Sequence, residues 1–266
     1  PPRSTPLYSS AASDVYKRQI RGLRPLHSQR KQIVVRIAEL YPSLQGEGRL
    51  AGTPSVFVRT SGCNLRCAWC DTPFTSWEPT GTNRAASGLV AEILQYGLKH
   101  VVITGGEPLL AADIHILCKS LQQAGQHITI ETAATLIPDE GPPAANLMSL
   151  SPKLQSSTPD EETGWEQRHE KHRRRDDVIQ LLRETPNQIK FVINSPSDLD
   201  EAVSWLHDLN IHPHSKEARH VYLMPQGVTQ SRLKKEAVWL EAACKRLGFQ
   251  LCQRHHIAWF GNTRGT

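Results

Sequence analysis

Short apolar stretches of strand-like composition alternate with amphipathic helical stretches from residue 33 onward. This order is typical of α/β proteins, in which crossover helices connect parallel strands. The sequence therefore predicts a parallel sheet curled into a full or partial (β/α) barrel. Strands are expected over residues 33–39, 55–60, 101–104, 127–131, 147–151, 189–193, 221–224 and 249–256, and helices over residues 87–96, 111–124, 197–209 and 230–247.

The length of 266 residues suffices for one large domain that needs no disulfide bonds. We expect residues 31–266 to form this domain and residues 1–30 to be a non-native or disordered segment. Residues 14–19 read DVYKRQ, which a transposon end used in sequencing libraries encodes, so about the first 19 residues are interpreted as an assembly artefact. A charged insertion near residues 155–180 lacks apolar periodicity over residues 158–177, which are expected to form an exposed loop.

The formal net charge of +5 is distributed unevenly along the chain. Residues 1–30 contain six Lys or Arg and one acidic residue, and the rest of the chain contains 25 of each sign. The body is therefore neutral, which argues against a nucleic-acid partner.

Neither a membrane span nor export is predicted from the apolar segments. The chain has no run of about 18 apolar residues, and its first residues lack the apolar stretch of a secretory signal. We therefore expect a cytoplasmic protein that does not bind membranes.

Three of the six cysteines lie within eight positions, in a C-x3-C-x2-C array of Cys63, Cys67 and Cys70. The array follows a predicted strand, so one loop can wrap three thiolates around three irons of a [4Fe–4S] cluster. The fourth iron then has no protein ligand and is open to a chelating cofactor. Radical S-adenosylmethionine (SAM) enzymes require this arrangement, because SAM binds the open iron and is cleaved to a hydrogen-abstracting radical. No side chain is therefore predicted to act as a catalytic acid or base.

Two other metal sites use cysteines at short spacing. A structural zinc site needs a fourth Cys or His at matching spacing, and an electron-transfer ferredoxin needs C-x2-C-x2-C with a fourth Cys. Neither pattern is present, because Cys118, Cys244 and Cys252 are scattered and are expected to be buried.

A double-glycine turn follows the predicted strand 101–104. Gly105 and Gly106 lack side chains, which lets the backbone approach a ligand closely. Glu107 directly follows and can accept a hydrogen bond from the ammonium group of SAM. Downstream of the cysteine array, this turn is predicted to position SAM.

Four sequence landmarks resemble one family of radical SAM enzymes, the 7-carboxy-7-deazaguanine synthases of queuosine biosynthesis. They are YPSLQGEG at 41–48, FVRTSGC at 57–63, CDT at 70–72 and GNTRGT at 261–266. The resemblance extends over residues 37–266 and implies a partial (β/α) TIM-like barrel of the radical SAM type.

The resemblance implies a carbon–nitrogen lyase that converts 6-carboxy-5,6,7,8-tetrahydropterin to 7-carboxy-7-deazaguanine and ammonia by a SAM-dependent radical ring contraction. It implies a [4Fe–4S] cluster, SAM and Mg²⁺ as cofactors. It also implies a pterin as small-molecule substrate, an electron donor such as flavodoxin, and a homodimer.

The resemblance also assigns individual residues. One hydroxyl, that of Thr72, matches a Mg²⁺ ligand, and Thr266 is expected to offer substrate its own carboxylate, which fails if the native chain continues. SAM-binding positions match Trp69, Cys70, Asp71, Gly106, Glu107, Ser151, Pro152 and Lys153. Substrate-binding positions match Leu44, Gln45, Gly46, Arg59, Thr104 and Thr266, with Arg59 as the partner of the substrate carboxylate.

Two stretches need comment within this resemblance. The family motif Glu-Thr-Asn-Gly-Thr is expected after the fourth strand, but residues 131–135 read ETAAT, so the turn geometry that glycine permits is in doubt. Near the end of the chain, His255 and His256 lie on a strand-like segment and are expected to be ordinary core or surface residues.

Two other functions remain open at this point. A glycyl-radical-activating enzyme shares the cysteine array but needs an open groove for a polypeptide. In a synthase, by contrast, Gln45, Arg59 and Thr72 should converge on one small cavity. A zinc-bearing RNA-binding module would need a basic face near the cysteines, which the neutral body does not favour.

Overall fold

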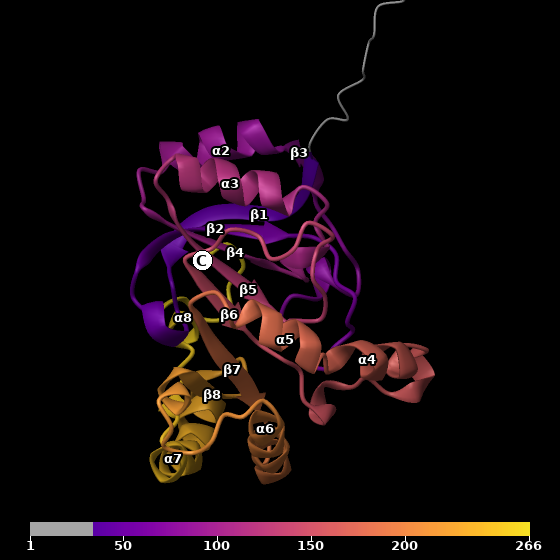
Figure 1. Ribbon diagram of the computed structural model, residues 1–266, viewed down its shortest axis with the longest axis vertical. Coiled ribbons are helices and arrows are strands. Elements are labelled where there is room, and N and C mark those ends of the chain that lie inside the picture. Colours follow the sequence, from indigo (N-terminus) through magenta and orange to yellow (C-terminus); the bar gives the residue numbers. More distant parts are fainter. Residues whose placement is uncertain (1–33) are drawn as a thin grey trace, which may run out of the picture. The chain divides into compact units, whose positions relative to one another are not determined.

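The described part of the chain, residues 34–266 of the computed structural model, is built on a single mixed sheet (Figure 1). The expectations for residues 1–30 lie outside these described residues. Within them the strand order is β3-β1-β2-β4-β5-β6-β7-β8-β9. The strands are β1 (Val34–Leu44), β2 (Pro54–Thr60), β3 (Thr82–Ala85), β4 (His100–Gly105), β5 (His127–Thr132), β6 (Leu147–Leu150), β7 (Asn187–Ile193), β8 (Val221–Pro225) and β9 (Gln250–Leu251).

The sheet is parallel from β2 to β9, and β1 pairs antiparallel with both β2 and β3. It does not close, since β3 and β9 are its two edges. The predicted partial barrel of parallel strands is therefore confirmed. The carboxyl ends of the parallel strands meet at one edge, where α/β proteins place their binding sites.

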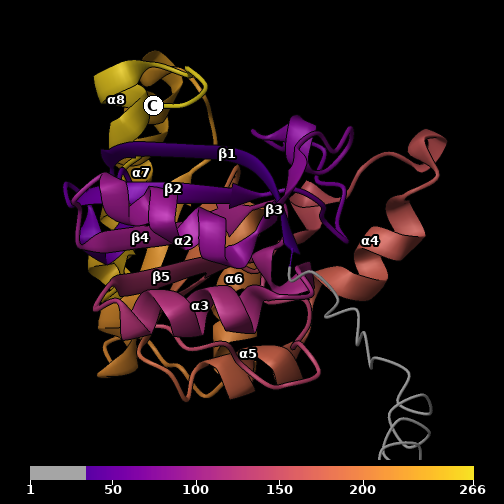
Figure 2. The ribbon, with the colours of Figure 1, turned by 90° about the horizontal axis from the view of Figure 1, so that it is seen from above.

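Helices connect the strands and cover the sheet. The helix α2 packs beside α3 (Figure 2). Four of the helices match the predicted ranges to within three residues at each end: α2 (Ala86–Gln95), α3 (Ile114–Gln123), α6 (Pro196–Asp208) and α7 (Gln230–Leu247). Three further helices within residues 34–266 were not predicted: α4 (Glu166–Arg173), α5 (Asp176–Leu182) and α8 (His255–Phe260).

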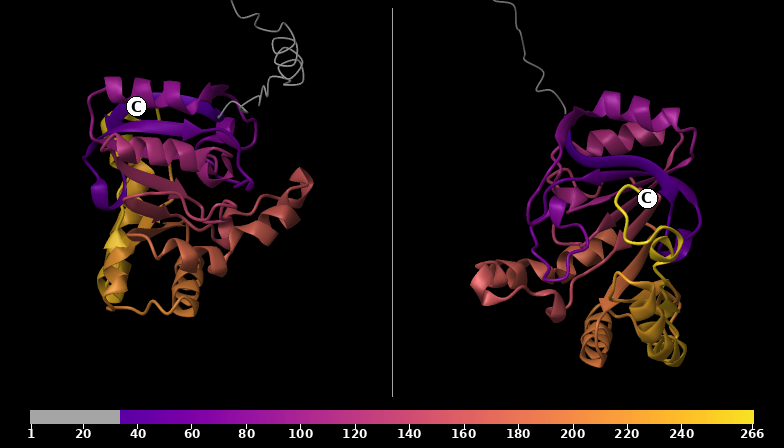
Figure 3. Two further views of the ribbon diagram at one scale, coloured as in Figure 1. Left: turned by 45° about the horizontal axis from the view of Figure 1, so that its top comes forward. Right: turned by 180° about the vertical axis from the view of Figure 1, so that it is seen from behind.

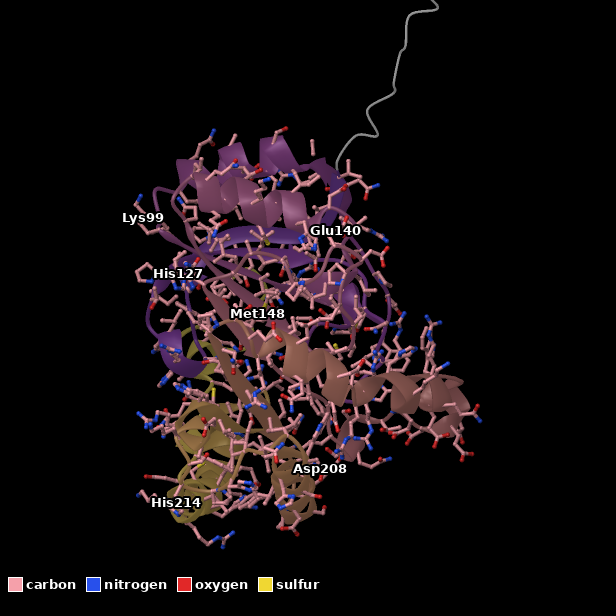
Figure 4. The ribbon with its side chains drawn as sticks, viewed as in Figure 1. Lys99, His127, Glu140, Met148, Asp208 and His214 are labelled. Atoms are coloured by element: carbon pink, nitrogen blue, oxygen red, sulfur yellow. The ribbon has the colours of Figure 1, made fainter. Side chains whose placement is uncertain are left out.

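One continuous apolar core lies between the sheet and the helices. Trp205 of α6 and Phe191 of β7 are its largest fully buried side chains, with ring centroids 5.8 Å apart. Met148 of β6 also lies in this core, whereas Glu140 and Asp208 are exposed (Figure 4). None of the helices in residues 34–266 has the length and apolarity that a membrane span requires.

The expected strand over residues 249–256 is wrong beyond Leu251. After Cys252, whose N–H still bonds Leu223 O at 2.8 Å, the chain leaves the sheet and forms α8. The reason is tertiary contacts. Arg254 donates hydrogen bonds to the carboxylates of Glu47 and Asp71 on other segments, and the N–H of His255 donates to Gly46 O at 2.9 Å.

The exposed loop expected over residues 158–177 is also wrong in part. This stretch contains α4 and the start of α5, and Figure 3 shows α4 extending outward from the sheet. Its sequence has no apolar stripe, because the one buried residue of α4 is the polar His169. Helical periodicity of apolar residues was therefore absent from the sequence.

Candidate functional site

A cavity of about 420 Å³ opens at the carboxyl ends of the parallel strands. The loop after β2 carries the three cysteines of the array, and all three line this cavity. The predicted substrate-binding residues come from the end of β1 and the loop after it, from β2 and β4, and from the end of the chain. All of them line the same cavity: Leu44, Gln45, Gly46, Arg59, Thr104 and Thr266.

Six of the eight residues predicted to bind SAM line the cavity, and two do not. Glu107 and Pro152 do not line the cavity. The others do: Trp69, Cys70, Asp71, Gly106, Ser151 and Lys153. Thr72, the predicted Mg²⁺ ligand, is also in the lining, with Oγ1 at 3.9 Å from Cys70 Sγ and 3.3 Å from the donating Thr75 hydroxyl.

The cysteine loop is held in place by hydrogen bonds to its sulfur atoms and carbonyls. The N–H of Leu65 donates to Cys63 Sγ at 3.4 Å, and Ser76 Oγ lies 3.2 Å from Cys70 Sγ. Trp77 donates its indole N–H to Cys67 O at 3.0 Å. Hydrogen bonds to the sulfurs of an iron–sulfur cluster tune its reduction potential, so this loop is suited to such a group.

The donor set fits a three-thiolate cluster. Cys67 packs with Leu65 and Ala133 in a small buried group that Cys63 and Cys70 also contact. Within residues 34–266, no three His, Cys, Asp or Glu side chains are close enough to hold one metal ion. A [4Fe–4S] cluster does not require such a group, because each thiolate binds a different iron atom and the three sulfur atoms do not share one metal ion.

Burial keeps two of these thiols protonated in the absence of metal. Desolvation raises the pKa of Cys63 and of Cys67 to about 12, and the nearby Glu107 carboxylate adds to the rise at Cys63. Bound iron must therefore displace the protons, as a coordinating metal does with a thiol.

The double-glycine turn packs directly against the cysteine loop. A Cβ on Gly106 would lie 2.1 Å from Gly62 O, and one on Gly105, whose φ is +136°, would lie 2.2 Å from Thr60 O. The N–H of Glu107 donates to Gly62 O at 2.8 Å. Any side chain at either glycine would separate the two segments that line this side of the cavity.

The Glu107 side chain is only 1% exposed and bonds the protein itself. Its carboxylate accepts from Ala133 N at 2.9 Å, from Thr132 Oγ1 at 2.7 Å and from Leu109 N at 3.1 Å. Desolvation raises the pKa of Glu107 even though these three donors act in the opposite direction. The side chain thus ties the glycine turn to the end of β5, and its predicted contact with SAM stays a prediction.

Arg59 is paired with residues of the neighbouring strand β1. Its Nε donates to Glu39 Oε2 at 2.8 Å and its Nη2 to the Tyr41 hydroxyl at 3.0 Å. Glu39 and Tyr41 also line the cavity and were not predicted. The sequence predicts a first strand that ends at residue 39, and this prediction does not place Tyr41 beside Arg59.

A second charged group surrounds Glu47. This residue lies two positions after Gln45 in the loop that follows β1, which we call the Gln45 loop. Its carboxylate pairs with Lys190 and Arg254, at 3.2 Å for Arg254 Nε, and lies 3.8 Å from His256 Nδ1. Burial alone would raise the pKa of Glu47, but Lys190 and Arg254 outweigh it and hold this pKa below its usual value. None of these four side chains was predicted to belong to the site. Lys190 was an available signal, because it is the single charged residue of the predicted buried strand 189–193 and a buried charge needs a partner.

The two other acidic side chains of the cavity, Asp71 and Glu131, are tied to this second group and to the Gln45 loop, respectively. Arg254 also bonds Asp71, and its Nη1 donates to Gly227 O at 2.7 Å. Gln45 donates its side-chain N–H to Glu131 Oε1 at 3.1 Å. The Gln45 loop, the cysteine loop and α8 therefore meet around Arg254 and Glu47.

Residues 262–266 fold back from α8 (Figure 3). All five of them belong to the lining of the cavity. Arg264 Nε donates to Glu39 Oε1 at 2.6 Å, and its guanidinium carbon lies 3.7 Å from the centroid of the Phe74 ring. This side chain therefore fastens the terminal segment to both β1 and the loop after Thr72.

The charged insertion packs on the cysteine loop from outside. Burial lowers the pKa of His169 to about 4, so its neutral ring accepts from Arg66 N at 3.2 Å through Nδ1 and donates from Nε2 to Ser157 Oγ at 3.0 Å. Trp69 donates its indole N–H to Ser156 O at 3.0 Å. The insertion therefore supports the loop that carries the cysteines.

Comparison with known proteins places the chain among radical SAM enzymes. The model of the radical SAM superfamily matches residues 57–235. A 7-carboxy-7-deazaguanine synthase from Rhodopirellula baltica is 44% identical over 86% of this chain and 88% of its own length, and one from Halobacterium salinarum is 42% identical over 84% and 89%.

A solved structure supports the fold. The structure of QueE from Escherichia coli has a TM-score of 0.66 and 23% identity, and the match covers 88% of this chain and all of that one. At this identity the likeness concerns the fold alone. Together with the two curated relatives, these findings lead to one conclusion: the chain belongs to the radical SAM superfamily and, within it, to the family of 7-carboxy-7-deazaguanine synthases.

Proposed function

We propose that this protein is a carbon–nitrogen lyase that converts 6-carboxy-5,6,7,8-tetrahydropterin to 7-carboxy-7-deazaguanine and ammonia, in queuosine biosynthesis. One observation carries the proposal: Gln45, Arg59 and Thr72 line the same cavity as the three cysteines. This convergence suits a small substrate, whereas an enzyme that activates a glycyl-radical protein needs an open groove. The two relatives that match over most of their length support the same activity.

Three thiolates, those of Cys63, Cys67 and Cys70, would hold the [4Fe–4S] cluster. The cluster and SAM, when bound, supply a 5′-deoxyadenosyl radical that takes hydrogen from the substrate. The protein's own part is to hold SAM and substrate close together and away from water. SAM would be held by Trp69, Asp71, Gly106, Ser151 and Lys153, which line the cavity, together with the loop at Cys70. Glu107 and Pro152 lie outside the lining, and their contacts with SAM stay a prediction.

The charges of the cavity suit the two ends of a carboxylated pterin. Glu39, Arg59 and Arg264 together carry one net positive charge, and the guanidinium of Arg59 is suited to the substrate carboxylate. Around Glu47 the cavity is lined by three carboxylates, those of Glu47, Asp71 and Glu131. They outnumber the two cations there, Lys190 and Arg254. The carboxylate oxygens are acceptors for the amino and ring N–H groups of the pterin.

We assign the Mg²⁺ site to the hydroxyl of Thr72. One neutral oxygen is a weak ligand by itself, so substrate oxygens and water must complete the octahedron. The test is the dependence of turnover on Mg²⁺, which Thr72→Ala should shift to higher concentration and Thr72→Ser should retain.

Family membership supports three further proposals about the protein in the cell. We infer that it is a homodimer, that it works in the cytoplasm, and that its electron donor is a small redox protein such as flavodoxin. Equilibrium sedimentation tests the first of these, and turnover with purified flavodoxin in place of a chemical reductant tests the last.

The decisive assay uses protein reconstituted with iron and sulfide without oxygen. SAM, a reductant and 6-carboxytetrahydropterin are added, and the deazaguanine product is measured by mass spectrometry, with Cys67→Ala as the control without a cluster. Formation of the product supports the proposal. Cleavage of SAM to 5′-deoxyadenosine without the product would overturn this substrate while leaving the radical SAM assignment intact.

A further inference from the structure

Glu39 is shared between two guanidinium groups at the edge of the cavity. Its Oε2 accepts from Arg59 Nε at 2.8 Å, and its Oε1 accepts from Arg264 Nε at 2.6 Å. The side chains of Glu39 and Arg59 are 11% and 16% exposed, and all three residues line the cavity. The carboxylate therefore bridges a half-buried cation on β2 and a cation on the terminal segment.

The second guanidinium changes the charge that this group presents. With Glu39 alone, Arg59 would form a neutral pair with little attraction for an anion. Arg264 engages the other oxygen of Glu39, so the three side chains keep one net positive charge. Glu39 and Arg59 are mostly shielded from water, so solvent and salt screen these two charges less than that of Arg264, whose side chain is more exposed.

Arg264 is held at this position by a second contact. Its guanidinium carbon lies 3.7 Å from the centroid of the Phe74 ring, which is a favourable distance for a cation–π interaction. Phe74 belongs to the short 3-10 helix Pro73–Thr75, directly after Thr72. The side chain of Arg264 is 55% exposed but is thus fixed by two partners from different segments.

We propose that Arg264 is a positioning residue that sets substrate specificity: by sharing Glu39, it leaves the positive charge of Arg59 available to the carboxylate of the pterin. The inference rests on the proposed function and deepens it. It assigns the preference for carboxylated over uncharged pterins to a charge balance among three side chains, in which Arg264 acts through Glu39.

The test compares two stable analogues of the substrate, 6-carboxypterin and 6-methylpterin. Their affinities for the reconstituted, SAM-bound protein are measured by quenching of pterin fluorescence. In Arg264→Gln, the affinity for 6-carboxypterin should fall about tenfold, as expected for loss of a charged contribution, while 6-methylpterin binds as before. Arg264→Lys keeps the charge and should retain most of the preference.

A charge-restoring variant separates this role from a merely structural one. In Glu39→Gln/Arg264→Gln, the negative charge is removed together with the positive one, so Arg59 again presents a net positive charge. The double variant should recover the affinity for 6-carboxypterin. In steady-state assays, Arg264→Gln should raise KM for the carboxylated substrate with little change in kcat.

Several outcomes would overturn the inference. The first is an unchanged preference for 6-carboxypterin in Arg264→Gln. The second is an equal loss of affinity for both analogues, which would mean that Arg264 only closes the terminal segment. The third is no recovery in the double variant, which would mean that Arg264 contacts the ligand itself. Unchanged melting temperature and SAM affinity verify that the variants are folded. The proposed function fails separately, if the wild-type protein neither binds 6-carboxypterin nor converts the reduced substrate.

Discussion

Ala134 donates its backbone N–H to the hydroxyl of Thr132 at 2.9 Å, and it does so from a left-handed conformation with φ of +56°. Ala134 occupies the place where the family motif has glycine. The turn geometry that was in doubt without glycine is therefore formed, with an alanine that is 1% exposed. A residue with a Cβ is strained in this region of φ.

Replacing this alanine by glycine should stabilise the protein. Relief of the left-handed strain outweighs the greater freedom of glycine in the unfolded chain, so Ala134→Gly is expected to raise the free energy of unfolding by about 0.5–1 kcal/mol. The neighbouring Ala133 has no positive φ, so Ala133→Gly should lower it by a similar amount. Urea denaturation measures both, and destabilisation by Ala134→Gly would contradict the argument.

Loss of one thiolate should prevent cluster assembly without unfolding the protein. Cys67 contacts Leu65 and Ala133 beside the cavity, and Cys67→Ala removes one of three iron ligands. After anaerobic reconstitution, its iron and sulfide content should fall to near background, with an unchanged circular dichroism spectrum. Cys244→Ala, a change in the buried face of α7, is the matched control and should retain full iron. Equal iron in both variants would contradict the cluster site.

The buried pair of Lys190 and Glu47 should be strongly coupled. Their side chains are 6% and 13% exposed, so Lys190→Met leaves a poorly solvated carboxylate and should cost about 3 kcal/mol of stability. Glu47→Gln combined with Lys190→Met should cost less than the sum of the single changes, by about 1–3 kcal/mol. The measurement is a double-mutant cycle from urea denaturation.

A surface pair provides the comparison for this cycle. Lys245 and Glu241 lie 2.8 Å apart on α7 and are 75% and 53% exposed. Lys245→Met should change stability by no more than about 0.5 kcal/mol. Similar costs for Lys190→Met and Lys245→Met would mean that the Lys190 pair is not shielded from water in solution.

The stability of the metal-free protein should fall as the pH drops below about 6.5. Burial, and to a lesser extent His127, lowers the pKa of His100 from 6.5 to about 4. Between these two pH values, His100 is protonated in the unfolded chain but not in the folded protein, so lowering the pH favours unfolding. Above pH 6.5 both states are neutral at this residue and it contributes no pH dependence.

The variant His100→Gln tests this assignment. His100 bonds Ser55 Oγ at 2.6 Å and Thr129 Oγ1 at 2.8 Å, and glutamine keeps polar atoms at the site. The fall in unfolding free energy from pH 7 to pH 5 should be smaller in the variant, with His169 accounting for part of the remainder. An identical pH dependence in both proteins would assign the effect to other groups.

Local patterns in the sequence were sufficient for the sheet and for the cysteine loop. The strands β2, β4, β5 and β7 were located because runs of buried apolar residues are bounded by turn residues. The array of Cys63, Cys67 and Cys70 was recognised because its chemistry depends on spacing within one loop. The segments α4 and α8 were missed because their conformations depend on polar contacts with distant residues, such as that of His169 with Arg66 N.

The sequence by itself determined the class of fold, the three thiolates, the glycine turn and the family, because all of these depend on residues close together along the chain. Only the tertiary structure decided how the cavity is charged. Glu39 and Arg264 are 225 positions apart, and Lys190 and Glu47 are 143 apart. Such pairs arise from strand order, strand register and the path of the terminal segment, and these are settled by packing of the whole core rather than by any local pattern.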